Sequence, residues 1–194
     1  MKTLLVKKIF SSLQGEGANT GKAAIFIRLS GCNLECYFCD TDFKGGIRMT
    51  LEEIKNNIKD LSGGFIVWTG GEPTLQLTDE VVDYFHHAGY VQAIESNGLL
   101  PIPLGIDWKV VSPKENLEEV KRANPNVDEL RIPFIAGVPV PSPEDLPTAD
   151  FYIVSPVFDG DKVNKKNVKG AVDFVLDNPA WAISLQLHKI LNIE

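Results

Sequence analysis

The chain has 194 residues, of which 44% are hydrophobic and 23% are charged, an average composition for globular proteins that excludes a wholly disordered chain. At roughly 100 to 200 residues per domain, this length predicts a single domain that covers residues 1–194. Nineteen Lys and Arg side chains against 26 Asp and Glu give a net charge of −7, which argues against a protein that coats nucleic acid or an anionic membrane.

The first residues do not have the pattern of a targeting signal. The charges of Lys7 and Lys8 interrupt the apolar stretch of residues 4–6 after three positions, which is too early for a signal peptide. No stretch approaches the roughly 18 to 20 apolar residues of a membrane helix. We therefore expect a cytoplasmic protein with no membrane partner and no nucleic-acid partner.

Eight apolar stretches are typical of β-strands. They cover residues 4–10, 24–29, 65–68, 91–95, 107–111, 129–133, 151–155 and 182–187. Thr50 and Glu53 form a capping box for a helix that runs to about Leu61, and Thr78 begins a helix that Gly89 ends. Two more helices are expected near residues 116–123 and 168–176.

This order of elements predicts the fold class. Strands that alternate with helices argue for a parallel sheet built from right-handed βαβ units. A complete eight-fold barrel needs about 250 residues, so we expect an α/β fold with a truncated, open parallel barrel. The Pro-rich stretch from Pro133 to Pro147 is expected to be a loop within this domain.

All three cysteines, Cys32, Cys36 and Cys39, fall within eight residues in the spacing C-x3-C-x2-C. An odd, clustered set is a poor disulfide framework, and the reducing cytoplasm does not favour disulfides. Thiolates gathered so closely are typical of a metal site.

The number of ligands separates two kinds of metal site. A structural zinc ion needs four protein ligands, so His86, His87 or His188 would have to join the cysteines from far along the chain. A cluster of iron and sulfide held by three cysteines keeps one iron without a protein ligand, and this open iron can bind and activate a small molecule. The spacing favours the iron–sulfur cluster, and a non-catalytic zinc-binding module stays as the alternative.

With the aromatic residue Phe38 directly before the last cysteine, the loop resembles that of the radical S-adenosylmethionine (SAM) superfamily. The resemblance implies that the open iron binds the amino and carboxylate groups of SAM. Reductive cleavage of SAM then supplies a 5'-deoxyadenosyl radical. The fold that the resemblance implies is a partial, TIM-like radical SAM core.

Polar and Gly-rich residues follow four of the expected strands, at residues 69–73, 94–98, 110–114 and 155–160. Ligands of parallel α/β folds bind where strands end, although each segment alone could be a plain turn or helix cap. Gly70 and Gly71 would let a ligand approach the backbone closely, and Glu72 could accept a hydrogen bond from an ammonium group. The repetition predicts a ligand site at these strand ends.

The segment S-L-Q-G-E-G at residues 12–17 lies between two expected strands. Gln14, Glu16 and Arg28 offer amide, carboxylate and guanidinium groups, which suit a planar heterocycle that carries a carboxylate. Arg28 would form the bidentate pair with that carboxylate. The alternative is a solvated loop beside a surface salt bridge.

Together with S-L-Q-L-H-K at residues 184–189, these motifs resemble the 7-carboxy-7-deazaguanine synthase family from about residue 9 onward. The resemblance implies a carbon-nitrogen lyase that rearranges 6-carboxy-5,6,7,8-tetrahydropterin to 7-carboxy-7-deazaguanine with loss of ammonia, a step toward queuosine. It implies a 4Fe-4S cluster, SAM as a regenerated cofactor, and Mg2+. Another radical SAM enzyme, such as a glycyl-radical activase, is the alternative within the superfamily.

The resemblance also implies a role for individual residues. The cluster ligands are Cys32, Cys36 and Cys39, and Thr41 offers its hydroxyl to the magnesium ion. The SAM contacts are Phe38, Cys39, Asp40, Gly71, Ser112, Pro113, Lys114, Ser155, Pro156, Val157 and Phe158. The pterin contacts are Leu13, Gln14, Gly15, Glu16, Arg28, Thr69 and the carboxylate of Glu194. Gln186 and His188 are expected in the last strand and have a smaller part in pterin binding. The expected partners are the pterin, a flavodoxin or ferredoxin as electron donor, and a second copy of the chain in a homodimer.

Overall fold

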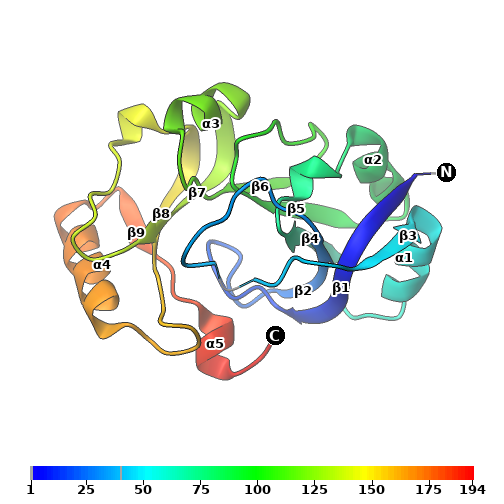
Figure 1. Cartoon of the computed structure of the whole chain (residues 1–194), viewed down its shortest axis with the longest axis horizontal. Helices are drawn as coiled ribbons and strands as arrows, with labels where there is room; N and C mark the ends of the chain where they lie inside the picture. Colours follow the sequence, from blue (N-terminus) through cyan, green and yellow to red (C-terminus); the bar gives the residue numbers. More distant parts are fainter. Residues whose placement is uncertain (1, 40) are drawn as a thin grey trace. The chain divides into compact units, whose positions relative to one another are not determined.

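The computed structural model describes residues 2–39 and 41–194, and Figure 1 labels its elements. The chain forms two compact units. Unit 1 comprises Met1–Ser12, Ala23–Ser96 and Leu100–Lys109, and unit 2 comprises Leu13–Lys22, Asn97–Leu99 and Val110–Glu194. The segment that carries Q-G-E-G therefore belongs to unit 2, although the strands on either side of it lie mainly in unit 1.

Unit 1 is built on five strands in the order β3-β1-β2-β4-β5. They are β1 (Thr3–Leu13), β2 (Ala23–Leu29), β3 (Ile47–Thr50), β4 (Phe65–Gly70) and β5 (Val91–Ser96). Strand β2 pairs with β4, and β4 with β5, in parallel, as expected, whereas β3 pairs with β1 in antiparallel. The sequence analysis did not predict β3. Its apolar residues Ile47 and Met49 alternate with Arg48 and Thr50, but four residues are too few to stand out beside the helix that follows.

Helices α1 (Leu51–Ile58) and α2 (Asp79–His87) bury their apolar residues in unit 1. The rings of Trp68 on β4 and Phe85 on α2 lie 5.2 Å apart edge to face. The Trp68 indole donates to the Gln92 side chain at 2.9 Å, and Gln92 donates to the Val82 carbonyl at 2.8 Å, so this buried polar group is paired. Between β4 and α2 lies a single turn of 3-10 helix, η1 (Pro73–Leu75).

The predicted capping box of α1 is confirmed. The Thr50 hydroxyl accepts a hydrogen bond from the Glu53 amide at 3.2 Å, and the Glu53 carboxylate accepts one from the Thr50 amide at 2.7 Å. Two of the amides that a helix leaves unpaired at its N-terminus are thereby satisfied, which fixes where α1 begins.

Unit 2 contains strands β7, β8 and β9 and, from Val110 onward, the end of β6, which form the parallel series β6-β7-β8-β9. Its elements are β6 (Trp108–Val111), α3 (Leu117–Ala123), β7 (Asn126–Phe134), η2 (Pro143–Asp145), β8 (Thr148–Pro156), α4 (Lys165–Asp177), β9 (Trp181–Ile183) and α5 (Leu187–Leu191). Phe174 of α4 packs its ring against Phe134 of β7 at 6.1 Å and Trp181 of β9 at 5.6 Å. This aromatic group holds α4 against the sheet.

The expected strand over residues 182–187 is wrong beyond Ile183. Strand β9 ends there, and helix α5 begins at Leu187. The Leu187 amide donates to the Gly15 carbonyl at 2.9 Å instead of continuing a ladder along β8. An alternating pattern over so few residues does not distinguish a strand from a single helical turn.

The edge strands of the series are β3 and β9, so the parallel sheet is open. The predicted α/β class with a truncated, open parallel barrel is therefore confirmed. Within residues 2–39 and 41–194, no helix has the length and apolarity needed to cross a membrane.

Candidate active site

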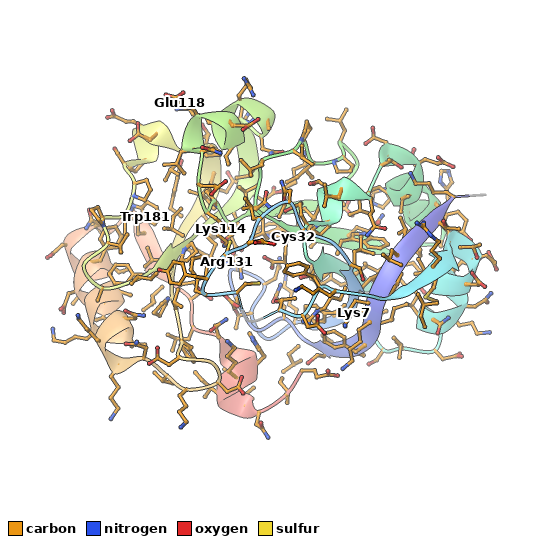
Figure 2. The ribbon with its side chains drawn as sticks, in the orientation of Figure 1. Lys7, Cys32, Lys114, Glu118, Arg131 and Trp181 are labelled. Atoms are coloured by element: carbon orange, nitrogen blue, oxygen red, sulfur yellow. The ribbon has the colours of Figure 1, made fainter. Side chains whose placement is uncertain are left out.

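The three cysteines lie in unit 1, on the loop that follows β2, and Figure 2 labels Cys32. Cys32 and Cys36 are half-buried and Cys39 is exposed, and all three thiols are free of disulfides. The Cys39 amide donates to the Cys36 carbonyl at 3.1 Å, which closes a tight turn between the last two cysteines. Burial raises the pKa of the Cys32 thiol, and the charges of Glu72 and Cys39 add to this effect.

The thiols fit an iron–sulfur cluster better than a single ion. In the part of the chain that the structure describes, no three His, Cys, Asp or Glu side chains form a group that could hold one metal ion. A tetrahedral zinc ion with Zn–S bonds of about 2.3 Å needs sulfurs about 3.8 Å apart. A cubane of iron and sulfide holds its cysteines farther apart and needs only thiolate ligands, which is what this loop offers.

The T-G-G-E turn after β4 lies against the base of the cysteine loop. The Gly71 amide donates to the Leu29 carbonyl at 3.1 Å, and the Glu72 amide donates to the Gly31 carbonyl at 2.8 Å. A Cβ atom at Gly71 would lie 1.8 Å from the Gly31 carbonyl oxygen, so no side chain fits there. Glycine at position 71 therefore lets this turn approach the backbone directly before Cys32.

The Glu72 carboxylate is fully buried. Its Oε1 atom accepts hydrogen bonds from the Thr74 amide at 3.0 Å, the Thr74 hydroxyl at 2.6 Å and the Ser96 hydroxyl at 2.9 Å. The carboxylate thus caps η1 and ties the end of β4 to the end of β5.

Arg28 and Thr69 lie opposite each other at the ends of the paired strands β2 and β4, as their predicted roles require. The Arg28 guanidinium lies 5.6 Å from the centre of the Phe10 ring, and Phe10 stacks on Phe26 at 5.0 Å. The Arg28 Nε atom is buried and makes no hydrogen bond to the described residues. A buried cationic donor in this state fits a ligand that brings a carboxylate.

The loop of residues 13–22 in unit 2 is closed by its own backbone. The Gln14 amide donates to the Lys22 carbonyl, and the Gly21 amide donates to the Gln14 carbonyl, both at 2.8 Å. The buried Gln14 side chain accepts a hydrogen bond from the Glu16 amide at 3.2 Å. A Cβ atom at Gly15 would lie 2.3 Å from Nδ1 of His188, so the loop packs directly against α5.

The Glu16 carboxylate is surrounded by donors of unit 2. Arg131 Nη1 lies 3.3 Å and the Ser155 hydroxyl 2.9 Å from Oε2, and Gln186 Nε2 lies 3.3 Å from Oε1. Burial alone would raise the pKa of Glu16, but Arg131, followed by Ser155, His188 and Gln186, lowers it below its ordinary value. Glu16 is therefore a carboxylate at neutral pH.

The other predicted SAM contacts follow the strands of unit 2. Lys114 donates to the Ser112 hydroxyl after β6. Phe158 is buried after β8, with the Lys189 ammonium 5.9 Å from the centre of its ring. Lys189 also donates to the Gly160 carbonyl at 3.0 Å, so α5 holds the loop that follows β8.

Each unit therefore gathers part of the predicted site. Unit 1 contains Arg28, Cys32, Cys36, Phe38, Cys39, Thr41, Thr69 and Gly71. Unit 2 contains Leu13, Gln14, Gly15, Glu16, Ser112, Pro113, Lys114, Ser155, Pro156, Val157, Phe158 and Glu194. The Thr41 carbonyl accepts a hydrogen bond from the Cys39 thiol at 3.8 Å. Glu194 is exposed beyond α5, and Asp40 lies outside the described residues.

Sequence reasoning missed Phe10 beside Arg28, and it missed Glu129 and Arg131 beside the loop of residues 13–22. A usable signal was present at the last two. Glu129 and Arg131 carry opposite charges two positions apart in β7, which places them on one face of the strand.

Comparison with known proteins shows which family the chain resembles. Residues 26–145 match the model of the radical SAM superfamily. The chain is 39% identical to a 7-carboxy-7-deazaguanine synthase from Bacteroides thetaiotaomicron, over 97% of this chain and 98% of that protein. It is also 39% identical to the protein of the same name from Burkholderia multivorans, over 98% of this chain and 99% of that protein.

The fold is similar to that in the crystal structure of QueE from Escherichia coli, with a TM-score of 0.72 and 22% sequence identity over 96% of this chain and 95% of that chain. Members of the radical SAM superfamily hold a 4Fe-4S cluster and SAM, and three thiols with no fourth cysteine in the sequence fit that requirement. The chain has the open α/β fold and the cysteine loop, and it is 39% identical to the named relatives over nearly its full length. It therefore belongs to the 7-carboxy-7-deazaguanine synthase family of radical SAM enzymes.

Proposed function

We propose that this protein converts 6-carboxy-5,6,7,8-tetrahydropterin to 7-carboxy-7-deazaguanine with loss of ammonia, in the biosynthesis of queuosine and related 7-deazapurines. The observation that carries the proposal is the position of Arg28. Its half-buried side chain, whose buried Nε makes no hydrogen bond to the described residues, lies on the strand that leads directly into the three-cysteine loop. A carboxylate held by Arg28 would place the substrate beside the group that reacts with it.

Each part of the reaction then falls to particular residues. Cys32, Cys36 and Cys39 hold the cluster, which together with SAM supplies a radical able to abstract hydrogen from the substrate. Arg28 pairs with the substrate carboxylate, and Thr69 lies beside it on the neighbouring strand. Glu16, which stays ionised, accepts hydrogen bonds from the amino-pyrimidinone edge of the pterin.

Further contacts complete the proposed site. Leu13 to Gly15 and the Glu194 carboxylate contact the pterin. SAM is bound by Phe38, Cys39, Asp40, Gly71, Ser112, Pro113, Lys114, Ser155, Pro156, Val157 and Phe158. The Thr41 hydroxyl and the substrate carboxylate hold a magnesium ion, which prefers oxygen ligands.

The proposal also concerns the protein's surroundings. We propose that residues 1–194 act as one radical SAM domain in a cytoplasmic homodimer. The reductant is a small one-electron carrier such as flavodoxin or ferredoxin. A reducing compartment suits the cysteine loop, because an iron–sulfur cluster needs thiolate ligands.

The deciding experiment is an anaerobic assay of the cluster-loaded protein with SAM, reductant, magnesium and carboxy-tetrahydropterin. We expect about four irons and four sulfides per chain and the deazaguanine acid as product, identified by mass spectrometry. Cluster-loaded protein that cleaves SAM without forming this product contradicts the proposal and favours another radical SAM reaction. One zinc and no sulfide per chain would instead favour a binding module.

A further inference from the structure

Two charged side chains of strand β7, Glu129 and Arg131, are buried in unit 2, with 1% and 6% of their surfaces exposed. Arg131 Nε lies 3.2 Å from Glu129 Oε1. Arg131 is labelled in Figure 2. Charged residues are almost never so deeply buried unless they are paired, and removal from water opposes their placement there. Neither residue has a part in the proposed chemistry, so their position needs an explanation.

Glu129 holds the backbone of the loop of residues 13–22. Its Oε2 atom accepts a hydrogen bond from the Ala18 amide at 2.9 Å. A Cβ atom at Gly17 would lie 2.1 Å from Oε1, and Gly17 has a φ of +75°, so only glycine lets the carboxylate approach here. The Gly17 amide donates to the Ser184 hydroxyl at 2.7 Å, so consecutive amides of the loop are bound.

Arg131 connects this carboxylate to that of Glu16. Its Nη1 atom lies 3.3 Å from Glu16 Oε2, while its Nε faces Glu129. One planar guanidinium therefore lies between two carboxylates and determines where the Glu16 carboxylate points. Glu129 acts on Glu16 through Arg131 and through the backbone that it holds.

We propose that Arg131 and Glu129 are positioning residues for the pterin. Together they hold the loop of residues 13–22 in the shape that presents Glu16 to the hydrogen-bond donors on the amino-pyrimidinone edge of the pterin. The inference rests on the proposed function, in which Gln14, Gly15 and Glu16 contact the pterin. Without Arg131, two like charges would face each other in a buried place, and the loop would lose the group that orients it.

The test compares three variants of the cluster-loaded protein, Glu129→Gln, Arg131→Lys and Arg131→Gln, with Tyr152→Phe as the matched control. Tyr152 lies on neighbouring strand β8, and its hydroxyl lies 3.2 Å from both the Ala149 amide and the Pro147 carbonyl. Phenylalanine removes these hydrogen bonds in the same unit without touching the loop. Thermal stability, the dissociation constants of pterin and SAM, and uncoupled SAM cleavage are measured for each protein.

We expect Arg131→Gln to weaken pterin binding about tenfold or more, because a charge-assisted contact is lost and its carboxylate partners stay buried. SAM affinity and uncoupled SAM cleavage should remain close to those of the wild type. Arg131→Lys should restore part of the affinity, since an ammonium keeps the charge without the fork. Tyr152→Phe should lower the melting temperature and leave pterin affinity unchanged.

Hydrogen exchange of the ligand-free protein gives a second readout. The amides of Gly17 and Ala18 should exchange faster in Glu129→Gln and Arg131→Gln than in the wild type, while the amides of the β7–β8 ladder keep their protection. Glu129→Gln preserves the size of the side chain and Arg131→Lys preserves its charge, so the comparison stands even where Arg131→Gln does not fold.

The outcomes separate the two proposals. A wild type that binds no pterin overturns the proposed function and this inference with it. A wild type that binds pterin, beside folded Arg131 and Glu129 variants with normal pterin affinity, overturns the inference alone. The same holds if SAM and pterin affinities fall together in proportion to lost stability, because that is the behaviour of a purely structural pair.

Discussion

The backbone amide of Glu72 donates a hydrogen bond to the carbonyl of Gly31 at 2.8 Å. Gly31 directly precedes Cys32, so the turn after β4 and the cysteine loop share a backbone contact. The Glu72 side chain is anchored in turn to Thr74 and Ser96. The base of the proposed cluster site is therefore fixed by hydrogen bonds within the protein itself.

A methyl group at position 71 should disturb this contact. Gly71→Ala would place Cβ 1.8 Å from the Gly31 carbonyl oxygen, so the backbone before Cys32 has to shift. We expect the variant to retain much less iron after reconstitution, measured by iron and sulfide analysis and by the visible absorbance of the cluster. Gly64→Ala is the control, because a Cβ there meets nothing within 4 Å. A Gly71→Ala protein with full iron content would contradict this account of the turn.

Charge reversal at Arg28 tests the carboxylate pocket. In Arg28→Glu the expected attraction for the substrate carboxylate becomes repulsion, so pterin binding should disappear. Cluster content and uncoupled SAM cleavage should stay close to the wild type, because Arg28 is not assigned to either. Calorimetric titration with the pterin checks the first expectation, and normal affinity in this variant would refute the role of Arg28.

Phe10 should support Arg28 from the side. Its ring centre lies 5.6 Å from the guanidinium, and a contact of this kind is worth about 0.5 to 1 kcal/mol when exposed and about 2 when desolvated. Phe10→Leu keeps an apolar side chain but removes this attraction, so pterin affinity should fall about two- to thirtyfold. Phe10→Tyr keeps an aromatic face and should bind like the wild type. Equal affinities in all three proteins would show that the ring does not contribute.

The capping box of α1 should contribute to stability and not to activity. Thr50→Ala removes the side-chain acceptor of the Glu53 amide and should cost about 1 kcal/mol. For a chain of this size, that corresponds to a melting temperature lower by about 2 to 4 °C. Because the two residues bond reciprocally, the cost of Thr50→Ala/Glu53→Ala should be less than the sum of the single costs. A loss of SAM cleavage at full folding would not fit a purely structural role.

The pH dependence of stability should report the charge of Glu16. Its pKa is lowered in the folded protein, so the stability it contributes is present above its unfolded pKa and is lost as pH falls through the lower folded value. Arg131, Glu129 and His188 are the charged or titratable groups that surround it, with Ser155 and Gln186 as hydrogen-bond donors. Arg131 is the group that lowers the pKa of Glu16 most strongly, and Arg131→Gln removes it. Burial should then raise the pKa of Glu16 in this variant.

Urea unfolding at pH 7 and at about pH 4 measures the effect. The wild type should exceed Arg131→Gln in stability at pH 7, and the difference should shrink on acidification as Glu16 becomes protonated in both proteins. A difference that is constant or grows toward low pH would mean that the ionised Glu16 is not what Arg131 stabilises.

The sequence predicts the buried strands and the capped helices of this fold well. Strand β4 begins with a continuous apolar stretch, β5 has apolar residues at Val91, Ala93 and Ile94, and α1 carries its start signal in Thr50 and Glu53. The pattern fails where tertiary contacts decide the local structure. The Leu187 amide bonds to Gly15, a residue 172 positions earlier, and this contact favours helix α5 over the alternating pattern of residues 182–187.

The site shows the same division. The spacing of residues in the sequence is sufficient to find the three cysteines and the Gly-Gly turn, because each of these motifs is formed by residues that are close together in the chain. Arg28 and Thr69 are found separately, and only the register of β2 and β4 places them opposite each other. The spacing of Glu129 and Arg131 indicates that they share one face of β7, but only the fold shows that they are buried beside the loop of residues 13–22.

The loop of residues 13–22 has partners that are made much later than the loop itself. Ala18 bonds to a residue 111 positions further along the chain, and Gly17 to one that is 167 positions further. At synthesis rates of about 5 to 20 residues per second, the second partner emerges roughly 8 to 33 s after the loop. The hydrogen bonds that hold Gly17 and Ala18 can therefore form only after Ser184 and Glu129 have been synthesised, long after the loop itself.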